Sequence, residues 1–190
     1  MKGMKFLCTF VFACTVAFLS SCSSDDVENL YSNEPARLYY SQVATTPQLR
    51  AALTSPGEFC IITYDLNKKL IFFSDYKGNT TPANFTADIA YRKPISVAKG
   101  FVIGTPQLPS VSGNGYEPVC YDLVCPNCLR DNSITRQMVF SGYGKLHCGR
   151  CNRVYDLNNS GMVVSGEDGR TPLRYRFIYN QAQNVLLINN

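Results

Sequence analysis

The chain has 190 residues, of which 45% are hydrophobic, 12% are aromatic and 17% are charged, and its formal net charge is +4. This composition excludes a disordered protein, a coiled coil and a multi-pass membrane protein, and so small a charge gives no basic surface for nucleic acid. The 12 Tyr and 11 Phe residues favour short, half-buried strands, so we expect an all-β domain. Because His147 is the one His in the chain, a mechanism that needs two imidazoles is excluded.

Residues 1–21 have the pattern of a secretory signal. Lys2 and Lys5 precede an apolar stretch from Phe6 to Leu19, which is too short for a membrane-spanning helix of about 20 residues. The next segment, Leu19-Ser20-Ser21-Cys22, resembles the lipobox of bacterial lipoproteins, in which the Cys is acylated and becomes the first mature residue. The resemblance implies lipidation of Cys22, for example with palmitate. A plain signal peptide with a small-residue cleavage site is the alternative.

The residues after Cys22 indicate where the protein is held. Ser23-Ser24-Asp25-Asp26 is similar to the export tag of some surface-exposed Gram-negative lipoproteins, which implies the outer membrane and the cell surface. We expect a lipid-anchored tether and N-terminal extension over residues 22–57 and one β domain over residues 58–190. Two or three acyl chains anchor a protein firmly, since each buried methylene contributes roughly 0.8 kcal/mol. The predicted partners are the membrane and an unidentified envelope protein.

The remaining chain has a β-rich pattern. A short helix is expected over residues 46–53, with Pro47 in its first turn. Residues 59–64 and 69–74 flank a segment of turn composition and predict a β-hairpin. Further β-rich runs cover residues 98–105, 119–124, 137–140, 162–165, 173–179 and 185–188. Strands at this spacing, without a long helix, predict an antiparallel sandwich or barrel.

Two C-x-x-C pairs carry the chemistry. Cys125 and Cys128 form the first pair, and Cys148 and Cys151 form the second after an interval of 19 residues. This spacing is typical of a four-thiolate zinc site. Two residues between thiolates let a tight turn aim both sulfur atoms at one point, and two facing turns then place four sulfurs about 2.3 Å from one ion. We expect Gly149 and Asn152 to help by adopting left-handed backbone conformations.

The two C-x-x-C pairs and the other thiols have alternative states. Each C-x-x-C pair could close as a disulfide in an exported protein. A thioredoxin-like redox pair would open a helix in an α/β fold, and we expect neither pair here to open a helix. Cys60 and Cys120 form a leftover pair that is either a disulfide or two buried free thiols. No combination of residues forms a convincing catalytic set, so no enzyme activity is expected.

The region around the second pair resembles the second half of a Rieske domain. The matching residues run from Leu146 through Cys148-Gly149-Arg150-Cys151, then Tyr155-Asp156, Gly161, Ser165-Gly166, Pro172-Leu173 and Val185 to Ile188. The resemblance is loose over residues 58–190 and more specific over residues 119–188. It implies a Rieske-like antiparallel β-sandwich or barrel, with the metal held between the two C-x-x-C loops at its tip.

The ligands depart from the Rieske pattern. A Rieske 2Fe-2S cluster binds one iron through two Cys and the other through two His. Here Cys128 stands near the first His position, and Cys151 replaces the second His. Ordinary Rieske ligation is therefore impossible. His147 is adjacent to Cys148, where a side chain usually points away from the site, and we expect it to be a surface or packing residue.

Two functions follow from these observations. The first is a non-enzymatic lipoprotein in which a structural Zn²⁺ joins two loops of a binding or scaffold module. The second is an electron carrier with a 2Fe-2S cluster or mononuclear iron on the same four Cys. Export favours zinc, because proteins that carry clusters outward use a twin-Arg signal, and this signal has Lys2 and Lys5 without an Arg pair. A chain exported unfolded acquires its metal outside, and zinc binding can drive local folding.

Overall fold

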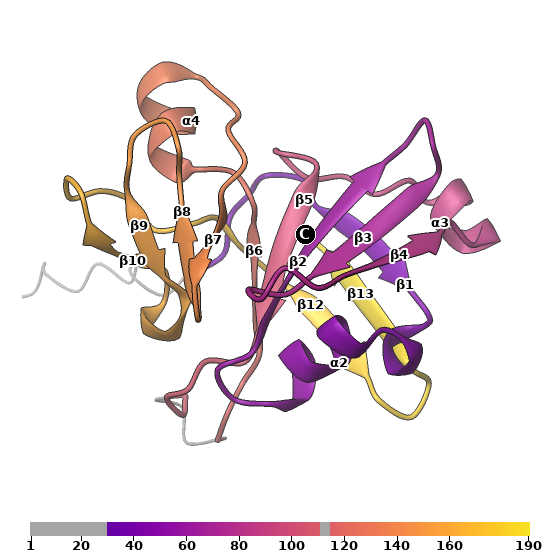
Figure 1. Cartoon of the computed structure of the whole chain (residues 1–190). Helices are drawn as coiled ribbons and strands as arrows, with labels where there is room; N and C mark the ends of the chain where they lie inside the picture. The colour runs from indigo at the N-terminus through magenta and orange to yellow at the C-terminus, as the bar shows by residue number, and fades with distance from the viewer. Residues whose placement is uncertain (1–29, 111–114) are drawn as a thin grey trace, which may run out of the picture. The chain divides into compact units, whose positions relative to one another are not determined.

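The computed structural model describes residues 30–110 and 115–190, and the residues from Tyr31 to Asn190 form one compact unit (Figure 1). The predicted signal segment, the predicted acylation site Cys22 and the start of the predicted tether lie outside the described residues. Within the unit, β1 and α2 take part in the core, so the part of the N-terminal extension from Tyr31 to residue 57 folds together with the β domain. No helix among the described residues is long and apolar enough to cross a membrane.

The described residues form three antiparallel sheets, so the expectation of an all-β fold is confirmed. The largest has the strand order β11-β6-β5-β2-β3-β4 and comprises Arg174–Tyr175, Val119–Asp122, Gly100–Gly104, Phe59–Asp65, Leu70–Ser74 and Thr80–Asn84. The second has the order β1-β13-β12 and comprises Arg37–Tyr40, Val185–Asn189 and Phe177–Asn180. The third has the order β10-β9-β8-β7 and comprises Met162–Ser165, Val154–Asp156, Lys145–His147 and Val139–Gly142. None of the three closes into a barrel.

The helices are short. They are α2 (Pro47–Thr54), α3 (Ala87–Tyr91) and α4 (Pro126–Asn132), with 3-10 turns η3 (Val43–Thr45) and η4 (Leu157–Asn159). The expected helix around Pro47 is confirmed as α2, in which Leu49, Ala52 and Leu53 are buried. The α4 helix was not predicted, and its consequence for the thiols is described with the site.

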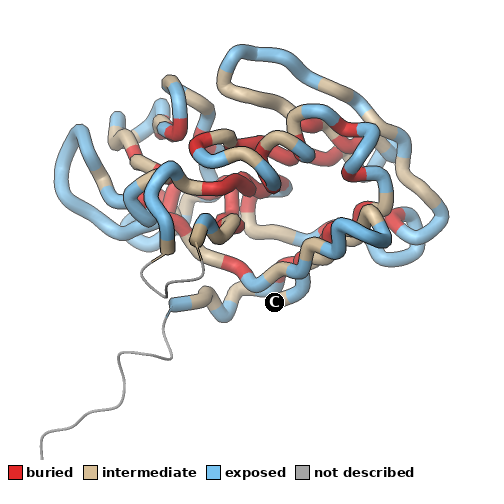
Figure 2. The backbone as a smooth tube through the Cα atoms, turned by 90° about the horizontal axis from the view of Figure 1, so that it is seen from below, coloured by how far each residue is buried: buried red, intermediate tan, exposed pale blue. Residues whose placement is uncertain are grey.

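The six-stranded sheet is the middle layer, because its two faces contribute to two different cores. Strand β2 sends Cys60 and Ile62 into one core and Phe59 and Ile61 into the other, as the period of two in a β-strand requires. The first core includes buried residues of the three-stranded sheet and of α2, and the second includes residues of the four-stranded sheet and three of the paired cysteines. Figure 2 shows the buried backbone gathered inside these layers. Strands buried on both faces lose the apolar-polar alternation, which explains the continuous burial of β5 and β6.

The predicted strands are mostly present with shifted ends. The hairpin is confirmed as β2 and β3, and Lys69 adopts a left-handed conformation (φ 53°) at its turn. The run 173–179 divides into β11 and β12, which belong to different sheets. Strands β1, β4, β8 and β9 were missed, since each has only three to five residues and lies outside the apolar runs. The chain thus crosses between layers more often than the sequence pattern indicates.

Candidate metal centre

The first C-x-x-C loop follows the end of β6. Cys125 precedes α4 as its N-cap, Pro126 occupies the first turn, and the N–H of Leu129 donates to the carbonyl of Cys125 at 3.1 Å. Pro suits this position because the first helical N–H groups have no intrahelical acceptor. The first turn of α4 therefore brings the side chains of Cys125 and Cys128 to the same side. The expectation that neither pair opens a helix was wrong for this pair, although α4 has only seven residues and lies among antiparallel strands.

The second C-x-x-C loop is the connection from β8 to β9. The N–H of Cys148 donates to the carbonyl of Arg153 at 3.0 Å, and the N–H of Asn152 donates to the carbonyl of Cys148 at 2.9 Å. Asn152 adopts the left-handed conformation that was expected (φ 56°), whereas Gly149 does not have a positive φ. Asn152 is thus the residue that lets the chain reverse between the two strands.

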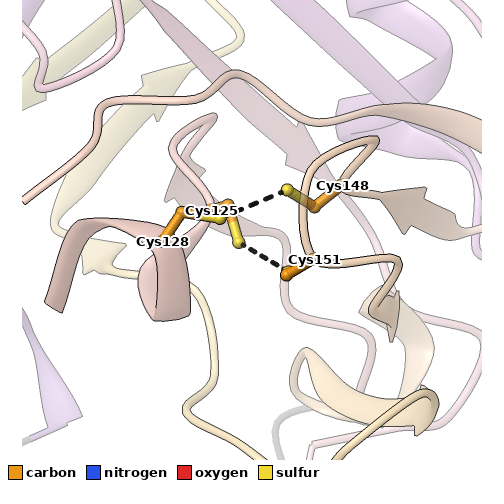
Figure 3. A group of neighbouring side chains, drawn as sticks. All are labelled: Cys125, Cys128, Cys148 and Cys151. Carbon is orange, nitrogen blue, oxygen red and sulfur yellow. Dashed lines mark hydrogen bonds between the residues drawn. The ribbon is translucent and has the colours of Figure 1, made fainter. Parts of the chain in front are cut away.

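The two loops face each other, and all four sulfur atoms converge (Figure 3). The Sγ atoms of Cys125 and Cys151 are 3.6 Å apart, and those of Cys128 and Cys148 are 3.7 Å apart. All four lie within 4.8 Å of one another. These distances are well above the S–S bond length of about 2.0 Å, and all four thiols are free. The structure thus brings together the four residues that the sequence spacing selected.

The spacing of the sulfur atoms fits one tetrahedral ion. Four thiolates at about 2.3 Å from a zinc ion lie about 3.8 Å from one another. The separations of 3.6 Å between Cys125 and Cys151 and 3.7 Å between Cys128 and Cys148 match this edge. A 2Fe-2S cluster divides its four thiolates between two irons, so thiolates on opposite irons are separated by the width of the cluster. The group could therefore hold one metal ion without a large movement of either loop.

A hydrogen-bond chain supports the sulfur of Cys125. The side-chain amide of Asn127 donates to the hydroxyl oxygen of Tyr155 at 2.8 Å, which leaves the hydroxyl proton free to point at Cys125 Sγ, 3.2 Å away. Asn127 also accepts from the N–H of Arg170 at 3.0 Å and donates to its carbonyl at 3.3 Å. The same amide therefore joins α4, β9 and the loop after β10. Such outer contacts orient metal ligands and raise metal affinity.

Arg153 acts on the sulfur of Cys151. Burial raises the pKa of this thiol, but the backbone N–H and the guanidinium of Arg153 and the neighbouring thiols outweigh burial and lower the pKa to about 7. Arg153 is held in turn by Glu167, whose carboxylate lies 3.0 Å from its Nη2. The positive charge next to the thiols offsets part of the negative charge that four thiolates would bring to one ion.

The other thiols of the group are more enclosed. Cys125 and Cys148 have no exposed surface, Cys128 is 2% exposed, and Cys151 alone is partly exposed. Burial raises the pKa of Cys125 and of Cys128, and in both cases neighbouring thiols add to the rise. Both shifts favour the protonated form of Cys125 and Cys128, and metal binding would have to displace these protons.

Cys60 and Cys120 do not form a disulfide, and both are buried free thiols. The sheet register explains why. Ile103 of β5 pairs with Cys60 on one side and with Cys120 on the other, so two strand spacings, about 10 Å, separate the two Cα atoms. A disulfide needs Cα atoms closer than roughly 7 Å. Both side chains belong to the first core, away from the four-cysteine group, and burial raises the pKa of each thiol.

Five other residues lie at or near the four-cysteine group. His147 is partly exposed at the end of β8 and does not belong to the group of metal-ligating residues. The sequence did not assign roles to Asn127, Tyr155, Arg153 and Arg170. Asn127 stands inside the first C-x-x-C pair, which was a usable signal, but nothing in the sequence shows that Tyr155 meets Cys125.

Comparison of the sequence with protein-family models and with curated proteins finds no match. The site is therefore interpreted from its own geometry.

Proposed function

We propose that this protein is a non-catalytic lipoprotein of the Gram-negative envelope, in which a structural zinc ion joins two loops of a Rieske-like binding or scaffold module. The observation that carries the metal part is the convergence of Cys125, Cys128, Cys148 and Cys151 within 4.8 Å. Zinc has no redox chemistry and binds four thiolates tetrahedrally, so it would hold the loops in one arrangement.

The position of the four-cysteine group supports a structural role. Cys125 and Cys128 extend from the six-stranded sheet through β6, and Cys148 and Cys151 belong to the four-stranded sheet through β8. An ion held by both loops would tie these two sheets together at one end of the second core. Metal binding at such sites contributes folding free energy, on the order of 10 kcal/mol in small zinc fingers.

The metal is tested on the purified full-length protein by elemental analysis and absorption spectroscopy. One zinc per chain and a colourless protein are expected. Cys125→Ser and Cys148→Ser should lose the metal, while Cys60→Ser, a buried cysteine outside the group, should keep it. A red or brown protein with stoichiometric iron would replace the zinc proposal by the electron-carrier alternative, since one iron accepts the same four thiolates.

The membrane part rests on Leu19-Ser20-Ser21-Cys22, and its test is independent of the metal. Cells expressing the protein are fed a clickable fatty acid and fractionated. Cys22→Ala should abolish labelling and release the protein from the membrane fraction, whereas Cys14→Ala, in the same leader, should change neither. Unchanged labelling of Cys22→Ala would refute the lipoprotein proposal without touching the metal proposal.

A further inference from the structure

A groove of about 530 Å³ lies at the point where the chain passes from the six-stranded sheet to the three-stranded sheet. Its walls include Tyr31, Arg174, Arg176, Phe177, Ile178 and Leu187. Ile178 is 65% exposed, although it is a large aliphatic residue. The groove therefore combines two cationic side chains with an apolar strip, and none of the four cysteines lines it.

One wall of the groove is an open sheet edge. β12 lies at the end of the order β1-β13-β12, and no backbone group of Phe177–Asn180 pairs with a further strand in the described part of the chain. The N–H of Asn189 donates to the carbonyl of Arg176 at 3.4 Å, so Arg176 and Asn189 form a hydrogen-bonded pair. Hydrogen-bonded and open pairs alternate along antiparallel strands. Phe177 and Tyr179 consequently point their N–H and C=O groups outward from the edge.

The edge of the neighbouring strand β11 is in contact with another chain segment. At β11 the outward carbonyl of Arg174 accepts a hydrogen bond from the N–H of Ser32 at 2.8 Å. One backbone hydrogen bond thus joins a preceding chain segment to the β11 edge, and the unpaired edge of β12 begins two residues after the end of β11. Natural proteins usually blunt or cover such edges, because an open strand is a template for another strand.

The positive charges beside the β12 edge favour an acidic partner strand. The guanidinium groups of Arg174 and Arg176 lie 5.4 and 4.5 Å from the ring centre of Tyr31. Among the described residues, no carboxylate lies within salt-bridge distance of either arginine, although Glu117 also lines the groove. Two arginines beside one aromatic ring favour a partner that brings carboxylates.

The apolar strip favours aliphatic side chains in the partner strand. Tyr39, Leu187 and Ile178 form one cross-strand row on the outer face of the three-stranded sheet, opposite the face that enters the core. A strand added to β12 would extend this row by one side chain, and an aliphatic residue there would cover Ile178.

We propose that the β12 edge binds an extended, acidic-apolar peptide segment of a partner protein by strand addition, pairing with Phe177 and Tyr179 and placing carboxylates against Arg174 and Arg176. Backbone hydrogen bonds supply affinity in this mode and side chains supply selectivity. A membrane surface fits less well, because lipid headgroups do not offer donors and acceptors in register with a strand edge. The proposal does not depend on the metal.

The test uses the full-length, metal-loaded protein and a fluorescein-labelled octapeptide of four Glu-Val repeats, read by fluorescence polarisation. The double variant Arg174→Glu/Arg176→Glu should weaken binding by about tenfold or more. The matched control Arg50→Glu/Arg92→Glu changes the net charge equally at two exposed positions outside the groove and should leave binding unchanged. A peptide of four Lys-Val repeats should not bind.

Backbone pairing is tested on the peptide, so that the protein fold is untouched. N-methylation of alternate amides should abolish binding in one register and spare it in the other, because only alternate N–H groups of an added strand face β12. Binding that is indifferent to both methylated peptides, or to the double charge reversal, would overturn the proposal.

Three further outcomes would assign the edge to another occupant and so overturn the proposal. A concentration-dependent dimer that Arg176→Glu dissolves would assign it to a second copy of the chain. Charge-dependent binding to phosphatidylglycerol vesicles without peptide binding would assign it to a membrane. Peptide binding that appears only after Asp25, Asp26 and Glu28 are neutralised would assign it to the chain's own N-terminal segment.

Discussion

Replacing Tyr155 with Phe tests whether the hydrogen-bond chain behind Cys125 strengthens metal binding. Tyr155 is completely buried, its hydroxyl lies 3.2 Å from Cys125 Sγ, and it accepts from Asn127 at 2.8 Å. The substitution removes one oxygen and keeps the ring, so it leaves no cavity. Asn127 keeps its contacts to the backbone of Arg170, and no buried amide is left without a partner.

The expected loss follows from the charge of the acceptor. A hydrogen bond to a charged group contributes about 1.5–3 kcal/mol, and the thiolate of Cys125 would carry charge once the metal is bound. This corresponds to a zinc affinity that is roughly 10- to 100-fold lower, the range seen when outer partners of metal ligands are removed. The metal-free fold should change less, by about 1 kcal/mol, because the uncharged thiol is a weak acceptor.

The assay is competition for zinc against a chromophoric chelator, together with thermal melting in the presence and absence of metal. Tyr175→Phe is the control, because Tyr175 is 1% exposed and donates to Asp122 at 3.0 Å in the other core cluster. It should lower the melting temperature of the metal-free protein and leave the zinc affinity unchanged. Equal zinc affinities for wild type and Tyr155→Phe, or an equal loss in both variants, would refute the reasoning.

Three further outcomes are expected. Gly169→Ala should weaken zinc binding, because its Cβ would lie 2.5 Å from Oδ1 of Asn127, the side chain that supports Tyr155 behind Cys125. Gly149→Ala lies between Cys148 and Cys151 but has nothing within 4 Å of its Cβ, so it should leave zinc titrations unchanged. Burial raises the pKa of Asp122, although its hydrogen bonds act in the opposite direction. Binding of a proton to this carboxyl group therefore stabilises the fold, fully so at a pH below the ordinary carboxyl pKa. This stabilisation is lost as the pH rises through the raised pKa. Urea unfolding of the metal-free protein should therefore show that, as the pH is lowered from neutral to about 4, the wild type gains stability relative to Asp122→Asn. Denaturation without reductant should expose Cys60 and Cys120 to iodoacetamide, and peptides that stay unlabelled in mass spectrometry would contradict the free thiols.

The four converging cysteines could be predicted because their spacing is a local property of the sequence. Each C-x-x-C pair makes its own turn, and a four-thiolate site requires that the two turns meet. The β-hairpin of β2 and β3 was equally visible, since an apolar run, a turn segment and a second run follow one another. Predictions of this kind depend on residues that are near one another in the chain.

The elements that the sequence missed depend on distant partners. β8 and β9 have three residues each, and they are strands because they pair with each other and with β7 and β10. The separation of Cys60 from Cys120 depends on β5 lying between β2 and β6, which no local pattern reveals. The same holds for Tyr155, whose meeting with Cys125 requires two sheets to pack.

Asp122 shows how packing of this kind connects elements that lie far apart in the sequence. This acid is fully buried, and its carboxylate accepts from the N–H groups of Val97, Ala98 and Val124 and from the hydroxyl of Tyr175. Val124 directly precedes Cys125, so the carboxylate accepts from the backbone immediately before the first C-x-x-C loop. Tyr175 belongs to β11, next to the groove at the β12 edge. One buried carboxylate thus connects the backbone before the metal loop to the strand that leads into the proposed peptide groove.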